Sequence, residues 1–233
     1  MNLAEKIKEL HASKYKFVIV SSGGGSNAIA SLLKVPGASN TVLEAYIPYA
    51  KESLDFYLMK KPDFYASKDT SLRMAARAYS AAKKIDQESS LNHLLGVSIT
   101  ASLSTTYEKR GDHKFHIALQ TQDFSKSISC KLEKGKRTRE EEEELVTAFV
   151  VNLLAECSEL EYDYPKIPEE VVFDEVKAEK GWAELMSNKI NYVLSEDAFP
   201  ELIFPGAFYP YHDGHKAMKD LAEQETGKKI FFE

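Results

Sequence analysis

The hydrophobic positions of this chain alternate between strand-like runs and helix-like stripes. The run Phe17–Val20 places four apolar residues with a β-branched bias in a row, which predicts a buried strand. From Asn27 onward the apolar residues Ile29, Leu32 and Leu33 recur at helical spacing. The glycine-rich stretch Ser21–Ser26 lies between the two. We therefore predict a strand that turns through glycines into a helix.

The same periodicities predict the other elements of the chain. Pro48 marks one predicted strand, at 41–49, as an edge strand or a strand end, and the alanine-rich helix at 70–86 is suited to close packing on a sheet. Further helices are predicted at 2–13, 51–60, 139–159, 168–177 and 181–194, and one ending near 225. Further strands are predicted at 94–101, 114–121, 125–132, 201–204 and 229–232.

This order of elements predicts an α/β fold with three regions. Residues 1–160 form a mixed sheet flanked by helices, residues 161–198 a linker with short helices, and residues 199–233 the opening βαβ piece of a Rossmann-like domain. A strand–turn–helix–strand series that stops on a strand is half of a unit. We expect the native chain to continue beyond 233.

Composition and charge narrow the function classes. The chain has 233 residues, 43% of them hydrophobic and 28% charged, as in ordinary globular proteins. The net charge of -6 disfavours nucleic acid or an anionic membrane as the main partner. Two cysteines, Cys130 and Cys157, make neither a zinc motif nor a disulfide framework, and no apolar run reaches membrane-spanning length. We expect a cytoplasmic protein.

The glycine-rich turn is the first candidate site. Free backbone N–H groups and the dipole at the start of a helix attract an anion such as a phosphate or an oxyanion, and the turn supplies Gly23, Gly24 and Gly25 as candidate binding positions. The alternative is a tight strand-to-helix turn with Ser26 as the helix cap. Spacing alone leaves both open.

The acidic run Glu140–Glu144 opens the predicted helix at 139–159. Carboxylates in a first helical turn suit the positive end of the helix dipole. We interpret the run as a solvated helix start rather than a metal site, and we predict no metal site in the chain.

Several motifs, taken in order, resemble the C-terminal domain of the CinA (competence/damage-inducible) family over about residues 1–160. Val35–Ser39 reads Val-Pro-Gly-Ala-Ser as in the family, Val20–Gly25 falls on its Ala-Glu-Ser-Cys-Thr-Gly-Gly, and Tyr49–Leu54 on its Tyr-Ser-Asn-Glu-x-Lys. The family includes pyridine-nucleotide amidohydrolases that act on nicotinamide mononucleotide. The resemblance implies a three-layer α/β domain that needs no cofactor.

That resemblance also implies roles for individual residues. Ser22 stands at the position of the family's nucleophile and Tyr49 at the position of the tyrosine that activates it. The family's lysine is replaced by Leu54, which cannot accept a proton, although Lys51 lies one helical turn earlier. The family's Gly-Ile-Ala-Gly-Pro loop is replaced by Thr100–Thr106.

A second resemblance concerns Phe204–His215, which reads FPGAFYPYHDGH. It is similar to the first signature of the nucleotidylyltransferase superfamily, whose members join a nucleoside triphosphate to a phosphorylated acceptor. It implies nucleotidyl transfer by His212 and His215, with a nucleoside triphosphate and Mg²⁺ as ligands. The positions that would bind the nucleotide are Gly206, Ala207, Phe208 and Gly214.

Three functions follow from these patterns. The leading hypothesis is a nucleotide-metabolism protein: a degenerate CinA-like nucleotide-binding domain linked to a nucleotidylyltransferase for adenylyl or cytidylyl transfer, with a pyridine nucleotide as one acceptor. The second is an active nicotinamide-nucleotide amidohydrolase that uses Ser22, Tyr49 and Lys51. The third is a non-catalytic dimerisation or regulatory module. The expected partner is a small nucleotide, with a homo-oligomer as an open alternative.

Overall fold

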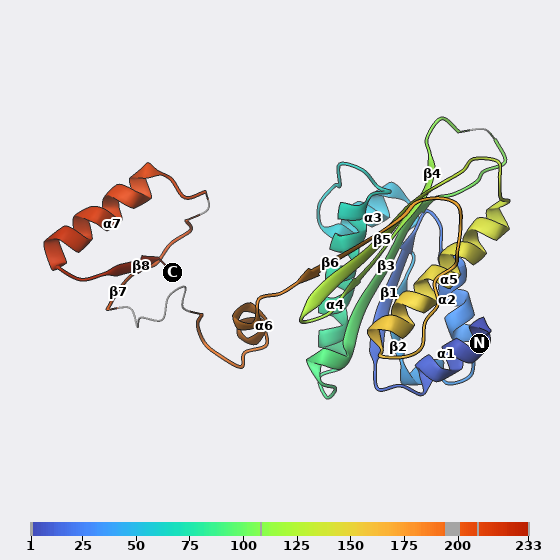
Figure 1. Cartoon of the computed structure of the whole chain (residues 1–233), viewed down its shortest axis with the longest axis horizontal. Helices are drawn as coiled ribbons and strands as arrows, with labels where there is room; N and C mark the ends of the chain where they lie inside the picture. Colours follow the sequence, from blue (N-terminus) through green and yellow to red (C-terminus); the bar gives the residue numbers. More distant parts are fainter. Residues whose placement is uncertain (1, 108, 194–200, 209, 233) are drawn as a thin grey trace. The chain divides into compact units, whose positions relative to one another are not determined.

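The computed structural model describes residues 2–107, 109–193, 201–208 and 210–232, which divide into two compact units, Met1–Ala183 and Glu184–Glu233. The first unit contains a six-stranded sheet in the order β2-β1-β3-β4-β5-β6. Strands β2, β1 and β3 run parallel, and β4, β5 and β6 each run antiparallel to the preceding neighbour. The predicted mixed α/β sheet is confirmed (Figure 1).

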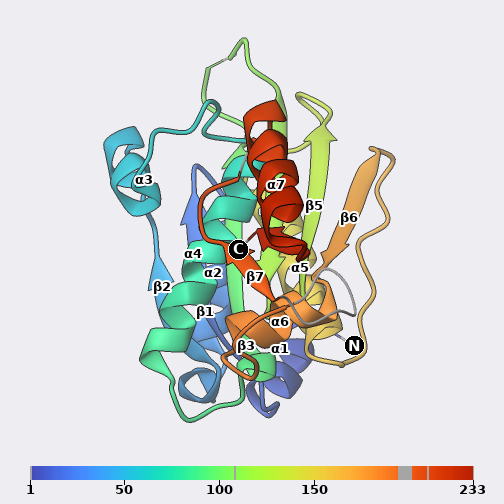
Figure 2. The ribbon, with the colours of Figure 1, turned by 90° about the vertical axis from the view of Figure 1, so that its left-hand side faces the viewer.

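The first unit contains the strand–turn–helix predicted from the hydrophobic pattern, after an N-terminal helix. Most of its predicted elements are present with boundaries shifted by a few residues, and β2 lies at an edge of the sheet as Pro48 indicated (Figure 2). Its strands are β1 (Lys16–Ser22), β2 (Val42–Tyr46), β3 (Leu94–Ser102), β4 (His113–Gln120), β5 (Phe124–Leu132) and β6 (Val171–Lys177). Its helices are α1 (Leu3–His11), α2 (Ser26–Lys34), α3 (Lys51–Leu58), α4 (Lys68–Ile85) and α5 (Arg139–Cys157), with α6 (Lys180–Met186) at the boundary between the units.

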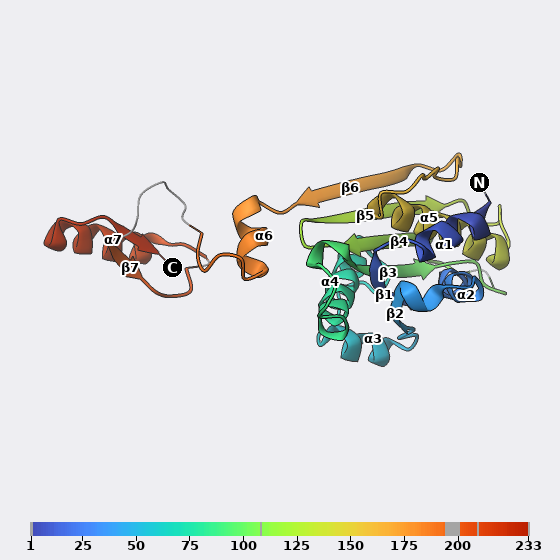
Figure 3. The same cartoon turned by 90° about the horizontal axis from the view of Figure 1, so that it is seen from below.

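Helices cover both faces of the sheet and make three layers. Successive side chains of a strand point to opposite faces, so Phe17 and Ile19 lie in the core beneath α1, α2 and α5, while Val18 and Val20 lie in the core beneath α3 and α4. Figure 3 shows α3 and α4 together on one side of the strands. The three-layer architecture predicted for this domain is therefore confirmed.

The sixth strand corrects one element of the sequence-based prediction. The expected helix at 168–177 is wrong, because this segment forms β6, which pairs with β5 from Cys130↔Val171 to Phe124↔Lys177. The segment is rich in β-branched residues, which favour a strand. Its backbone pairs with an edge of β5 that would otherwise be open. The compact unit consequently extends to Ala183, beyond the expected boundary at 160.

An ion pair holds the segment that leads into β6. The Arg137 guanidinium donates to both carboxylate oxygens of Glu169, at 2.5 Å from Nη1 to Oε1 and 3.0 Å from Nη2 to Oε2. This hydrogen bonding lowers the pKa of Glu169 to about 2. Such a two-pronged contact fixes both distance and orientation.

The second unit contains a small parallel βαβ motif. Strand β7 (Leu202–Phe204) pairs in parallel with β8 (Ile230–Phe232), and α7 (Asp213–Thr226) connects them. These elements agree with the predicted strand–helix–strand order. The helix expected at 181–194 is shorter, because α6 ends at Met186. Residues 194–200, which span the end of the expected linker and the start of the 199–233 segment, lie outside the described residues.

Close packing of α4 on β3 depends on one glycine. A Cβ atom on Gly96 would lie 2.1 Å from the backbone nitrogen of Tyr79 and 2.2 Å from the carbonyl oxygen of Ala75. Backbone atoms of a packed helix cannot move aside as a flexible side chain can. The small residues Ala75, Ala78 and Ala82, which are buried, allow the helix to approach this closely.

We predict that Gly96→Ala destabilises the first unit by about 3 kcal/mol, because the added methyl forces α4 away from the sheet. Urea unfolding followed by circular dichroism measures the loss. Gly111→Ala is the control, since a Cβ there meets no heavy atom within 4 Å. Equal unfolding midpoints for the two variants would show that the helix does not need this close approach.

Candidate functional site

The glycine-rich turn connects the buried end of β1 to α2. Gly23 and Gly25 have φ angles of +77° and +86°, in the left-handed region that glycine adopts without strain. A Cβ on Gly23 would also lie 2.2 Å from the carbonyl oxygen of Ala101. The Ser21 hydroxyl closes the turn by donating to the carbonyl oxygen of Gly24 at 2.8 Å. Both backbone conformation and space therefore require glycine here.

The anion position at the start of α2 holds a carboxylate of the chain itself. The backbone N–H of Gly25 donates to Oε2 of Glu143 at 2.8 Å, and the N–H of Asn27 approaches the same oxygen at 3.5 Å. Gly25, which has no side chain to cap the helix, is the N-cap of α2, so the alternative in which Ser26 is the cap is wrong. The turn attracts an anion as the sequence indicates, and Glu143 supplies it.

Arg139 locks this carboxylate in place. Its Nη2 donates to Oε1 of Glu143 and to the carbonyl oxygen of Gly23, each at 3.1 Å, and its Nη1 donates to the carbonyl oxygen of Ser104 at 3.3 Å. Arg139 and Glu143 lie one turn apart on α5. Together they join α5 to the glycine-rich turn and to the loop that follows β3.

The neighbouring carboxylate, Glu142, is buried as well. Its side chain has 0% exposure, Oε2 accepts from the backbone N–H of Ser104 at 2.6 Å, and Oε1 lies 2.8 Å from Nδ1 of His113. The interpretation of Glu140–Glu144 as a solvated helix start is therefore wrong for Glu142 and Glu143. The start of α5 lies against the loop that replaces the family's glycine-rich loop, and the carboxylates satisfy donors there.

Ser22, Tyr49 and Lys51 line one small cavity, as the motif comparison predicts. The cavity has a volume of about 110 Å³ and is enclosed by the end of β1, the start of α3 and part of β3. Pockets for small organic ligands usually measure about 300–1,000 Å³. The cavity is therefore too small for a nucleotide in this conformation.

The Ser22 hydroxyl donates its hydrogen to the carbonyl oxygen of Pro48 at 2.8 Å. A carbonyl cannot remove this proton, whereas a serine nucleophile needs a base within hydrogen-bond reach. Within the described part of the chain, the Ser22 hydroxyl has no hydrogen bond to Tyr49 or Lys51. The geometry holds Ser22 as a structural donor.

Leu54, at the position of the family's lysine, is a core residue. Its side chain is 1% exposed and packs with Val18, Val20 and Met74 between β1 and α4. A lysine in this place would have to bury its ammonium group. The amphipathic pattern of α3 thus directs position 54 into the core and away from solvent.

Neither of the remaining candidates, Lys51 and Tyr49, is positioned to take the proton of the Ser22 hydroxyl. The Lys51 ammonium group lies 5.7 Å from the ring centroid of Tyr65, a cation–π arrangement. The Tyr65 hydroxyl in turn donates to Oδ2 of Asp55 at 3.2 Å. Tyr49 is 69% exposed. The structure brings Ser22, Tyr49 and Lys51 to one cavity but does not connect them as nucleophile and base.

A second cluster lies at the start of α7 in the C-terminal unit. His212 is the N-cap of the helix, and its Nδ1 accepts from the backbone N–H of Gly214 at 3.1 Å. The rings of His212 and His215 are stacked with centroids 3.7 Å apart. Nδ1 of His215 is buried without a hydrogen-bond partner among the described residues. Two imidazole rings therefore lie together at the start of α7, where the backbone N–H groups of Gly214 and His215 donate to His212.

Other residues of the Phe204–His215 motif pack close to the histidine pair or to one another. The Phe208 ring lies 5.1 Å from the His215 ring and 4.3 Å from that of Phe232 in β8. A Cβ on Gly206 would meet the Phe208 ring at 2.9 Å, and one on Gly214 would lie 3.0 Å from the His212 ring. Ala207 is exposed, and Tyr209 lies outside the described residues.

The sequence did not identify Arg139 and Glu143 as site residues. Their spacing of four on a predicted helix is the one available signal, and it indicates an ion pair without indicating its location. The partner, the Gly25 N–H, lies more than a hundred residues earlier in the chain. Among the residues that the structure describes, no group of three or more His, Cys, Asp or Glu side chains is placed to hold a metal ion.

The first unit has a CinA-like α/β fold. Similar solved structures include a competence or damage-inducible protein from Enterobacter asburiae (TM-score 0.54, 14% identity, 68% of this chain and 99% of that chain). A competence/damage inducible protein from Agrobacterium tumefaciens matches with a TM-score of 0.53 and 15% identity, over 66% of this chain and 94% of that chain. At these identities the likeness establishes the fold.

A competence-damaged protein (CinA) superfamily member from Escherichia coli matches with a TM-score of 0.51 and 11% identity, over 64% of this chain and 87% of that chain. No protein-family model matches this sequence, and no curated protein matches it. No described helix is long and apolar enough to cross a membrane.

Proposed function

We propose that this protein acts in nucleotide metabolism. Its C-terminal unit carries the first signature of a nucleotidylyltransferase, and its CinA-like unit binds a nucleotide without hydrolysing it. The observation that carries the proposal is the stacked pair His212 and His215 at the start of α7, the helix that connects the two strands of a parallel βαβ motif.

The chemistry of nucleotidyl transfer suits this arrangement. A phosphate oxygen of the acceptor attacks the α-phosphorus of a nucleoside triphosphate, the new O–P bond forms, and the bond to the β-phosphate breaks to release pyrophosphate. Negative charge grows on the transferring group, and imidazole N–H donors stabilise it. Mg²⁺ enters with the triphosphate as part of the substrate. His212 and His215 would hold the phosphates in line.

Two features support loss of amidohydrolase chemistry in the CinA-like unit. The Ser22 hydroxyl donates to a carbonyl, and Leu54 occupies the place of the base within the core. Removing the base from a serine nucleophile costs several orders of magnitude in rate. The amidohydrolase alternative rests on Lys51, which lines the same cavity as Ser22.

For the transferase role we predict that the full chain binds ATP or CTP with Mg²⁺, and that His212→Ala together with His215→Ala weakens this binding by about tenfold or more, since charge-assisted contacts to phosphate are lost. Isothermal titration calorimetry measures the affinities. Met218→Ala, an exposed change on the same helix, serves as the control. Equal affinities for the wild-type chain and the double-histidine variant would refute the assignment of the pair.

For the CinA-like unit we predict no hydrolysis of nicotinamide mononucleotide above the level of Ser22→Ala, because no base reaches the Ser22 hydroxyl. Release of ammonia or of nicotinic acid mononucleotide reports the reaction. Ser104→Ala is the matched control, since Ser104 bonds through its backbone. Turnover that Ser22→Ala and Lys51→Gln each abolish, in variants that melt like the wild type, would establish the amidohydrolase instead.

A further inference from the structure

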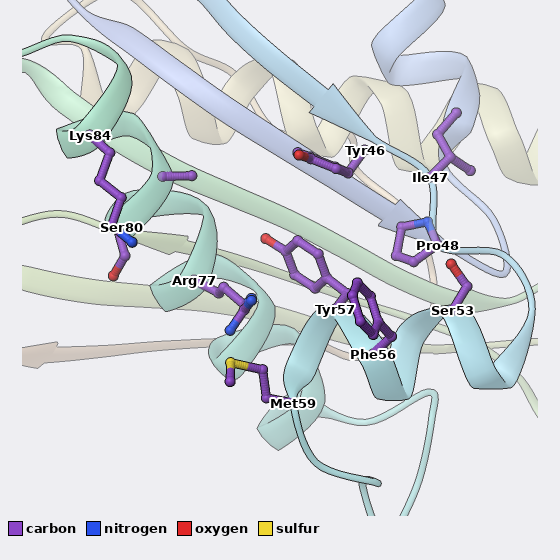
Figure 4. A pocket seen from close by; sticks show the side chains of 11 residues that line it. Tyr46, Ile47, Pro48, Ser53, Phe56, Tyr57, Met59, Arg77, Ser80 and Lys84 are labelled. Atoms are coloured by element: carbon purple, nitrogen blue, oxygen red, sulfur yellow. The ribbon is translucent and has the colours of Figure 1, made fainter.

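A larger hollow lies on the other side of α3 from the Ser22 cavity. It has a volume of about 470 Å³, within the range of small-molecule sites, and is formed by the end of β2, by α3 and by α4. Figure 4 shows the side chains of Tyr46, Phe56, Tyr57, Arg77 and Lys84 around it. All of these elements belong to the first unit.

Aromatic rings form one wall of the hollow. The rings of Tyr46 and Tyr57 lie with centroids 5.7 Å apart, and Phe56, at 86% exposure, presents its ring to solvent beside them. Burial raises the pKa of Tyr57, and hydrogen bonding to Glu44 raises that of Tyr46, so both hydroxyls keep their protons at neutral pH. The Tyr57 hydroxyl donates to the carbonyl oxygen of Met74 at 3.5 Å. This wall therefore offers flat, uncharged stacking surfaces.

Two cations of α4 line the hollow beside the aromatic rings. The Arg77 guanidinium lies 5.4 Å from the Tyr57 ring centroid, and Lys84 follows two helical turns later with Ser80 between them. In the described part of the chain, neither cation forms an ion pair with a carboxylate.

Other cations of α4 behave differently. Arg73 pairs with Asp69 at 2.9 Å and Lys68 pairs with Asp174 at 2.8 Å. Lys83 lies over the Tyr79 ring at 4.9 Å, outside the hollow. Arg77 and Lys84 line the hollow, and no carboxylate of the described residues pairs with them. An apolar partner surface would gain nothing from them, whereas a phosphate would pair with both.

We propose that this hollow binds a phosphorylated aromatic ligand of the mononucleotide class. The base stacks on Tyr46 and Tyr57, and the phosphate pairs with Arg77 and Lys84. The inference rests on the nucleotide-binding role proposed for the CinA-like unit and assigns that role to a site other than the glycine-rich turn, where Glu143 already holds the anion position.

The hollow also touches the segment that holds Ser22. Pro48 lines the hollow, and its carbonyl oxygen accepts the hydrogen bond of the Ser22 hydroxyl. A ligand in the hollow thus contacts the loop between β2 and α3 without entering the small cavity.

The test is isothermal titration of the full chain in a His212→Ala and His215→Ala background, which removes the proposed triphosphate site of the C-terminal unit. Adenosine monophosphate and nicotinamide mononucleotide are the probes, with adenosine and inorganic phosphate as partial ligands. We expect at least one monophosphate to bind more tightly than either partial ligand. Arg77→Gln and Lys84→Gln should each weaken that binding about tenfold or more.

The control variants are Arg73→Gln and Lys83→Gln, which make the same charge changes on the same helix outside the hollow, and melting curves verify the fold of each variant. A monophosphate that binds equally to Arg77→Gln and Arg73→Gln would refute this site and leave the nucleotide-binding role intact. If neither monophosphate binds, the site in the hollow and the nucleotide-binding role of the CinA-like unit are both refuted. Self-association that Phe56→Ser abolishes, with no monophosphate binding, would instead identify the occupant as a second copy of the chain.

Discussion

The contact between the Glu143 carboxylate and the backbone N–H of Gly25 is the constraint on which the rest of the CinA-like unit depends. It satisfies the start of α2, where the N-cap residue Gly25 has no side chain of its own, with a carboxylate from α5. Arg139 adds hydrogen bonds to Gly23 and Ser104, so one ion pair joins a helix, a turn and a loop that are far apart in sequence. Hydrogen bonds of this charged kind contribute roughly 1.5–3 kcal/mol each.

This constraint also decides what chemistry the turn can perform. A helix start that already holds a carboxylate repels a second anion, and Ser22 beside it donates its proton to Pro48. Because Leu54 lies in the core, the cavity that Ser22 lines has no proton acceptor at the position of the family's lysine. The features that we propose to bind phosphate lie elsewhere: the cations that line the hollow between α3 and α4, and the histidine pair at the start of α7.

The sequence predicted those parts of the fold that rest on local pattern. The apolar run Phe17–Val20, the alanines of α4 and the strands that became β3, β4 and β5 each carry their own periodicity. The segment of β6 was assigned to a helix, because its pairing with β5 is a contact between distant segments and Pro168 offered a local helix start. The three residues that the motif positions singled out, Ser22, Tyr49 and Lys51, line one cavity.

The contacts that define the site could not be predicted in the same way. Glu142 and Glu143 look like solvated residues of an acidic helix start until the fold brings the loop after β3 and the glycine-rich turn against them. The hollow likewise combines Tyr46 of β2, Tyr57 of α3 and Arg77 of α4, which no single motif contains. Both depend on long-range packing rather than on spacing.

The most direct measurement of the central claim is the backbone amide NMR signal of Gly25 during titration with inorganic phosphate. If Glu143 fills the anion position, the Gly25 and Asn27 signals stay in place in the wild-type chain and move in Glu143→Gln, while Glu144→Gln, a change at an exposed neighbour, behaves like the wild type. A saturable shift of the Gly25 signal in the wild-type chain would contradict the account, because it would show that phosphate competes successfully for the turn.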